Sequence, residues 1–197
     1  HYCVLMPHFF HSTPKDAYLK VIKKIPLSQL ILLDKKLPEF NGHKGVYQDF
    51  MVDIYHALLS NKSVFAKYEE MCLIFPEHSN HPKEIIEGIA AFCRVCNLRF
   101  NMLRGIKDKM ISEGQIFMTL TESDLAEAIK TIKGSCFKLG GEVGIISFND
   151  TIFKELLDIT VVTTDFAQMG RSLAKIILEK KDEVISNPFR LILRSSL

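Results

Sequence analysis

The stretch Gly141–Thr151, "GEVGIISFNDT", places an apolar run directly before three polar residues. The run Val143–Phe148 has the length of a strand and is apolar on both faces, which is typical of a central strand in a helix-covered parallel sheet. Ligands of such sheets bind beyond the carboxyl ends of the strands. Asn149 and Asp150 therefore stand where a binding residue would stand. Either side chain could also cap the helix predicted to follow, and the two roles are compatible.

The charge balance and hydropathy of the chain are typical of a globular protein. Of its 197 residues, 47% are hydrophobic and 24% are charged, and the formal net charge is +2. This balance lacks the strongly basic footprint of nucleic-acid binders, and no window has the length and purity of a membrane span. A chain of this length folds as one large domain or as two small lobes.

The cysteines and histidines do not form a recognisable metal or redox motif. The odd number of cysteines on apolar segments, five in all, indicates reduced thiols in a cytoplasmic protein. Cys93 and Cys96 have redox or zinc spacing but no second pair, so we expect core packing. Four histidines fall near two predicted strand ends: His8, His11, His78 and His81. Their spacing is irregular and no cysteine or carboxylate completes the set, so we predict no metal and no cofactor.

Strand and helix patterns alternate along the whole chain. This alternation predicts an α/β protein with doubly wound parallel sheets. Near the end we predict a long amphipathic helix over residues 166–185 and a terminal strand within residues 188–197. The polar segment Ser60–Lys67 is a candidate seam between two lobes, and a second crossing is expected near Leu157.

Three stretches resemble one family: "GIISFNDT" (Gly144–Thr151), "TTDFAQMG" (Thr163–Gly170) and "NPFRLILRSSL" (Asn187–Leu197). They resemble the effector-binding domain of lactose-repressor-type transcription regulators, whose tail has an Arg-x-Ser motif like that of Arg194–Ser196. They are also similar to gluconate-repressor-type regulators that carry such a sensor domain. The resemblance covers nearly the whole chain and implies a two-lobed, periplasmic-binding-protein-like fold.

The resemblance also implies how the lobes are assembled. The first lobe would comprise residues 1–62 and 163–186, and the second residues 63–162 and 187–197. In the family, two strand–helix units and a DNA-binding head precede the equivalent of "YCVLMP", so we expect an incomplete first lobe and a DNA-binding head outside this chain. An arginine that grips sugar hydroxyls in the family is replaced here by Ile85, three residues before Gly88.

In the family the ligand lies between the lobes, where planar hydrogen-bonding groups and aromatic faces contact a sugar. The candidate ligand-binding residues are His8, Phe9, Asp49, Glu122, Phe148, Asn149 and Asp150. Phe148 and either Phe9 or Phe10 would stack on the sugar ring. The structural alternatives are core packing for the phenylalanines, an N-cap for Asp49, and for Glu122 the start of a helix, which we favour.

The implied function is ligand sensing in a sugar-responsive bacterial transcription regulator. A small carbohydrate-like effector would bind between the lobes, and closure would be relayed to the DNA-binding head. The alternative is a periplasmic sugar-binding protein of a transport system, which shares the fold. No nucleophile is paired with a base and no phosphate-binding glycine loop is present, so we do not expect an enzyme.

We also expect a cytoplasmic homodimer without a membrane partner. A two-fold protein matches a two-fold operator, so regulators of this type bind DNA as dimers. Two apolar helix stripes could serve as the interface or could cover their own sheets. One stripe contains Ile85, Ile89, Phe92 and Cys96, and the other contains Met169, Leu173, Ile176 and Ile177.

Overall fold

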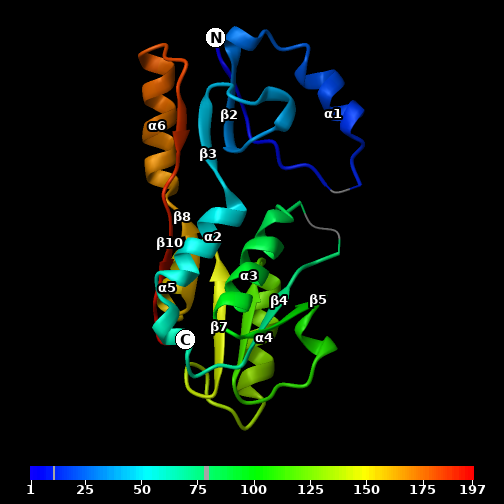
Figure 1. Cartoon of the computed structure of the whole chain (residues 1–197), viewed down its shortest axis with the longest axis vertical. Helices are drawn as coiled ribbons and strands as arrows, with labels where there is room; N and C mark the ends of the chain where they lie inside the picture. The colour runs from blue at the N-terminus through cyan, green and yellow to red at the C-terminus, as the bar shows by residue number, and fades with distance from the viewer. Residues whose placement is uncertain (11, 78–79) are drawn as a thin grey trace. The chain divides into compact units, whose positions relative to one another are not determined.

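The computed structural model describes residues 1–10, 12–77 and 80–197, which divide into two compact units (Figure 1). The first unit consists of His1–Asp49, Asn80–Pro82 and Asp165–Pro188. The second unit consists of Phe50–Ser79, Lys83–Thr164 and Phe189–Leu197. Each unit is built on one largely or wholly parallel sheet with helices on both faces, so the predicted α/β fold is confirmed.

The second unit contains a six-stranded sheet in the order β10-β8-β7-β6-β4-β5. The strands are β4 (Glu70–Ile74), β5 (Arg99–Leu103), β6 (Gln115–Thr119), β7 (Val143–Phe148), β8 (Thr160–Thr164) and β10 (Phe189–Ile192). Five strands are parallel, and β10 runs antiparallel beside β8. Chain order reverses between β4 and β6, so the crevice at their carboxyl ends is the expected ligand position of a doubly wound sheet.

Alternate residues of these strands enter two separate cores, one on each face of the sheet. Met71 and Leu73 of β4 pack with α2 (Phe50–Leu59) and α3 (Glu84–Val95). Cys72 and Ile74 face the other way and pack with α4 (Glu122–Lys133). This two-sided burial explains why strands such as β7 are apolar throughout.

The first unit contains a four-stranded parallel sheet in the order β1-β2-β3-β9. Its strands are β1 (Cys3–Leu5), β2 (Leu30–Lys35), β3 (Gly45–Gln48) and β9 (Val184–Ser186). Helix α1 (Lys15–Ile22) packs on one face and α6 (Phe166–Leu178) on the other (Figure 1). This unit also contains the 3-10 turns η1 (Leu27–Gln29) and η2 (Pro38–Phe40), whereas the short helix α5 (Ile152–Leu156) and the 3-10 turns η3 (Lys62–Phe65) and η4 (Ile106–Asp108) belong to the second unit.

The first crossing between the units lies at Asp49, whereas the sequence places it at residue 62. The reason is the packing of α2, whose residues Phe50, Ile54 and Leu58 are buried in the same core as α3. Gly88 permits this close approach, because a Cβ atom there would lie 2.5 Å from the carbonyl oxygen of Met51. Helix α2 therefore belongs to the second unit.

The predicted helix over residues 166–185 is too long. Helix α6 ends at Leu178, Lys180 adopts a left-handed φ of 51°, and β9 then pairs in parallel with β3. The charged segment after α6 is a good helix former, but the strand pairing satisfies its backbone groups instead, as when Gly45 donates its N–H to Glu183 O. Tertiary pairing here overrides local propensity.

Both apolar helix stripes cover their own sheets. Ile85, Ile89 and Phe92 are fully buried in the core of the second unit, and Met169 and Ile176 are buried in that of the first. Cys93, also on α3, is buried in the core of the second unit, and this burial raises the pKa of its thiol to about 12. Within the described ranges, no helix is long and apolar enough to cross a bilayer.

Candidate ligand-binding site

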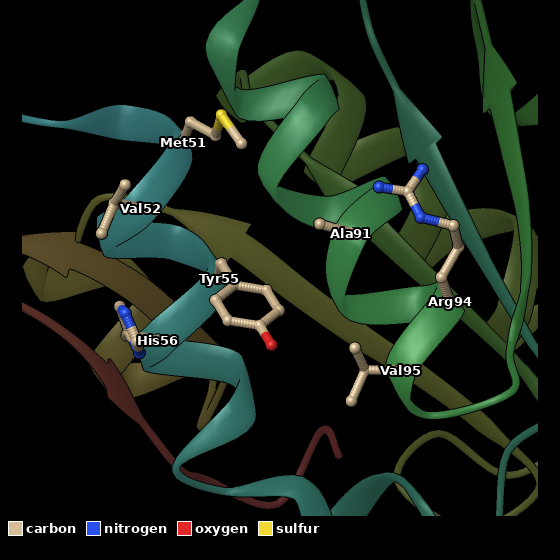
Figure 2. Close-up of a pocket in the computed structure, with 7 residues that line it drawn as sticks. All are labelled: Met51, Val52, Tyr55, His56, Ala91, Arg94 and Val95. Carbon is tan, nitrogen blue, oxygen red and sulfur yellow. The ribbon is translucent and has the colours of Figure 1, made fainter.

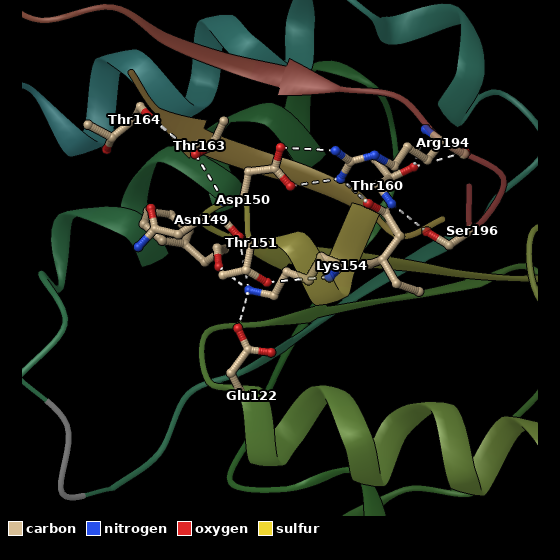
Figure 3. A network of polar contacts seen from close by, with 12 residues as sticks. Glu122, Asn149, Asp150, Thr151, Lys154, Thr160, Thr163, Thr164, Arg194 and Ser196 are labelled. Atoms are coloured by element: carbon tan, nitrogen blue, oxygen red, sulfur yellow. Dashed lines mark hydrogen bonds and ion pairs between the residues drawn. The ribbon is translucent and has the colours of Figure 1, made fainter. Parts of the chain in front are cut away.

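Polar side chains of the second unit gather beyond the carboxyl ends of β6 and β7 (Figure 3). We call this group the second polar edge: Glu122, Asn149, Asp150 and Lys154, together with Arg194, whose backbone lies beside the start of β8 and whose side chain reaches Asp150. Asn149 directly follows β7, has a left-handed φ of 62°, and donates its N–H to Val162 O at 2.7 Å. Its Oδ1 atom is buried and has no hydrogen-bond partner among the described residues. Because buried polar atoms are normally paired, this oxygen is a candidate acceptor for a ligand.

The Asp150 carboxylate is bound by Arg194 of the C-terminal tail. Arg194 donates two parallel hydrogen bonds to its carboxylate, each 2.9 Å long, and a third to Ile159 O at 2.9 Å. These bonds lower the pKa of Asp150 and raise that of Arg194. Such a bidentate pair fixes both position and orientation.

The helix after β7 is capped by neither Asn149 nor Asp150. Thr151 is the N-cap of α5, and its hydroxyl accepts the Lys154 N–H at 3.3 Å. The two polar residues singled out from the sequence therefore have other contacts. Asp150 is bound to Arg194, while the buried oxygen of Asn149 is without a partner in the described structure.

The Arg-x-Ser tail joins the first half of β7 to the start of β8. The Ser196 hydroxyl donates to Ile145 O and accepts the Thr160 N–H, each at 2.8 Å. Gly140 allows the tail to pass, because it has a φ of 77° and a Cβ atom there would lie 1.8 Å from Ser195 O. The tail thus links β7 and β8 near their amino-terminal ends, while the Arg194 side chain extends to Asp150 at the second polar edge.

Lys154 is a member of this edge that the sequence did not reveal. Its ammonium donates to Phe148 O at 2.7 Å and Asn149 O at 2.9 Å, and it lies 3.0 Å from Glu122 Oε1. The Lys154 side chain is only 2% exposed, whereas that of Glu122 is 61% exposed. Glu122 is the first residue of α4, as expected, and it also reaches this network.

The first unit has a corresponding group, the first polar edge: His8, Asp34 and Asp49. Asp34 lies near the end of β2, and its Oδ2 atom is 2.6 Å from His8 Nε2. It has a left-handed φ of 73°, and its Oδ1 atom is buried without a partner among the described residues. The same signal that singled out Asn149, a polar residue ending a buried strand, also marks Asp34.

The other predicted site residues have different surroundings. Phe148 is buried in the core of the second unit, close to Phe189, so its surroundings match the core-packing alternative. Phe9 stacks on Tyr18 with ring centroids 4.2 Å apart and packs on the core of the first unit, while Phe10 is exposed. Asp49 is exposed and directly precedes α2.

No group of three histidine, cysteine, aspartate or glutamate side chains suited to a metal occurs among the described residues. His8 pairs with Asp34, while His11 and His78 lie outside the described part of the chain. The histidine positions therefore provide no positive support for a metal.

A separate groove of about 270 Å³ runs between α2 and α3 (Figure 2). It is mostly apolar and is lined by Met51, Val52, Tyr55, His56, Ala91, Arg94 and Val95. Because its walls are two outer helices rather than strand ends, it differs from the usual ligand position of a parallel sheet.

Comparison with known proteins establishes the fold. The sequence matches no protein-family model and no curated protein sequence. The Escherichia coli transcriptional repressor AscG superposes with a TM-score of 0.72 at 15% identity, covering 100% of this chain and 78% of that one. The chain has the fold of LacI-family transcription regulators.

Two further structures have this fold and carry bound molecules. A sugar-binding LacI-family regulator from Escherichia coli, complexed with phosphate, has a TM-score of 0.71 at 14% identity, covering 98% of this chain and 76% of that one. A LacI-family regulator from Enterococcus faecalis with bound ribose has a TM-score of 0.66 at 20% identity, covering 92% and 71% respectively. The predicted resemblance is thus confirmed at the level of the fold.

Proposed function

We propose that this chain is the ligand-sensing part of a sugar-responsive bacterial transcription regulator and not an enzyme. The observation that carries the proposal is the chemistry of the two polar edges. In each unit an Asp or Asn at the carboxyl end of a strand adopts a left-handed backbone and keeps a buried oxygen that has no hydrogen-bond partner in the part of the chain that the structure describes. The LacI-family fold supports the proposal, because ligands of parallel sheets bind at strand carboxyl ends.

The proposed effector is a small carbohydrate-like molecule. Asn149 Oδ1 and Asp34 Oδ1 are acceptors, so they suit the hydroxyl donors of a sugar. Glu122, Asp49 and His8 would add polar contacts at the same edges. Asp150 would act indirectly, because both of its oxygens already bind Arg194.

Effector binding would be relayed to a DNA-binding part of the regulator in the cytoplasm. A ligand shifts a conformational equilibrium only through its different affinities for the two states. We expect the residues of both polar edges to respond to the same effector.

Isothermal calorimetry with neutral monosaccharides and sugar phosphates tests the proposal. Asn149→Ala should weaken binding of the sugar that binds wild type by about tenfold or more, because it removes a hydrogen bond made to the ligand. Asn97→Ala is a matched control, because Asn97 also has a left-handed φ, of 57°, but follows α3 at the amino-terminal side of β5. Unchanged affinity in Asn149→Ala would refute the proposed site.

We also propose that the regulator is a homodimer and that α5 lies in its interface. Helix α5 exposes Ile152, Phe153 and Leu156, at 74%, 75% and 76% respectively. The apolar stripes of α3 and α6 are used internally, so α5 is the better candidate. A stable interface buries about 800 Å² per partner, so neighbouring surface must contribute as well.

Sedimentation equilibrium over a range of concentrations tests the dimer. Phe153→Asp should shift the protein towards monomer, because a carboxylate would be buried in an apolar interface. Phe10→Asp, on an exposed aromatic residue of the first unit, is the control. A wild type that remains monomeric at every concentration would contradict the dimer.

A further inference from the structure

Helix α5 has an inverted arrangement of polar and apolar side chains. Its apolar residues face solvent, while Lys154 is turned inwards and is 2% exposed. An isolated amphipathic helix on a protein surface normally buries its apolar stripe. The buried contacts of Lys154 favour the observed orientation of α5.

Those contacts are made to the backbone at the end of β7 and to Glu122 of the second polar edge (Figure 3). The ammonium donates to the carbonyl oxygens of Phe148 and Asn149, at 2.7 and 2.9 Å, and pairs with Glu122 Oε1 at 3.0 Å. An ammonium has three N–H donors, so these three partners use its full donor capacity.

The two carbonyls flank the point where the backbone leaves β7. Asn149 there adopts a left-handed φ of 62°, a conformation that costs free energy in a residue other than glycine. A buried ammonium bound to both carbonyls stabilises that turn, and with it the direction of the Asn149 side chain. The same ammonium also pairs with Glu122, the first residue of α4, and so links this turn to α4.

We infer that Lys154 is a positioning residue that holds Asn149 in its binding conformation and ties the second polar edge to the exposed apolar face of α5. The role of Asn149 as a ligand contact rests on the proposed function. The connection between Asn149, Glu122 and α5 rests on the Lys154 contacts alone. A ligand that draws Glu122 away from Lys154 would loosen α5, so effector binding and partner binding at α5 would be linked.

Three variants of the full chain separate this role from general stability. Lys154→Met removes all three contacts, whereas Lys154→Arg retains a cationic donor and should rescue them in part. Glu122→Gln leaves both carbonyl contacts in place and removes only the ion pair. Its matched control is Glu127→Gln, because Glu127 lies on α4 like Glu122. This change removes an exposed ion pair in which Glu127 Oε2 lies 3.1 Å from Lys107 Nζ.

Carbon-13 chemical shifts of Asn149 and amide exchange over residues 152–157 are measured without ligand. Lys154→Met should move the Asn149 shifts away from left-handed values and speed exchange in α5 by about tenfold. Glu122→Gln should speed exchange in α5 by a smaller factor, and Glu127→Gln should leave it unchanged. If Lys154→Met does not fold, the Arg and Gln variants still decide the outcome.

Unchanged Asn149 shifts and α5 exchange in Lys154→Met, or equal effects of Glu122→Gln and Glu127→Gln, would overturn the inference. Calorimetry with D-ribose and D-glucose on wild type and Lys154→Arg tests the proposed function separately. If wild type binds neither these sugars nor any other of the calorimetric panel while the exchange results hold, the proposed function fails and the connection from Asn149 to α5 stands.

Discussion

The two polar edges end their strands with the same chemistry but are braced very differently. Asp34 and Asn149 both have left-handed backbones and a buried oxygen without a hydrogen-bond partner within residues 1–10, 12–77 and 80–197. In the second unit, Lys154 binds the Asn149 turn and Arg194 grips the next residue. In the first unit, the Asp34 side chain is held by His8 alone among the described residues. At the second edge, two long basic side chains therefore fix the turn at Asn149 and Asp150, whereas at the first edge the His8 imidazole contacts the Asp34 carboxylate.

The largest effect should follow from removing the tail brace of the second unit. Arg194→Ala leaves the Asp150 carboxylate and the Ile159 carbonyl without their donor. Loss of a charged partner from a partly buried group should lower the free energy of unfolding by about 2–3 kcal/mol. Urea denaturation measures this, with Arg190→Ala, on an exposed side chain of β10, as control. A loss no larger than in the control would show that the tail does not brace this edge.

A smaller effect is expected in the first unit. His8→Ala removes one hydrogen bond to Asp34, so the free energy of unfolding should fall by about 1 kcal/mol. Urea denaturation again measures the change, and His56→Ala, on an exposed histidine of α2, is the control. If His8→Ala cost as much as Arg194→Ala, the two edges would be equally braced and the contrast would be wrong.

The smallest expected effect is on the way stability falls at acidic pH. The hydrogen bonds from Arg194 lower the pKa of Asp150, so the folded state favours the carboxylate more than the unfolded chain does. This contribution to stability is present above the unfolded pKa of about 4 and is lost as pH falls through the lower folded value. Denaturation midpoints between neutral and acidic pH should therefore fall less steeply in Asp150→Asn than in wild type. The exposed Glu113→Gln should keep the wild-type slope; an unchanged slope in Asp150→Asn would contradict the account.

The buried strand and the polar residues after it could be predicted from the sequence because both have a local signal: Val143–Phe148 is apolar on both faces, and Asn149 follows at once. The same signal could have identified Asp34, which ends another apolar strand. The Arg-x-Ser tail has no such signal and stood out only through the family resemblance.

The remaining features depend on tertiary contacts. The core shared by α2 and α3 decides to which unit α2 belongs, and pairing with β3 ends α6 early. In α5 the sequence shows an apolar face opposite Lys154 but cannot show which of the two is buried. The carbonyls at the end of β7 and the carboxylate of Glu122 make the inward position of the lysine favourable.

The central claim is that the polar edges bind a small carbohydrate-like effector. Titration of isotope-labelled protein with neutral monosaccharides, followed by backbone amide NMR, tests it most directly. The account predicts that a binding sugar shifts the signals of Asn149 and Asp150 in the second unit and of His8 and Asp34 in the first. Shifts confined to the α2/α3 groove around Tyr55 and Val95, or no shifts with any sugar, would contradict it.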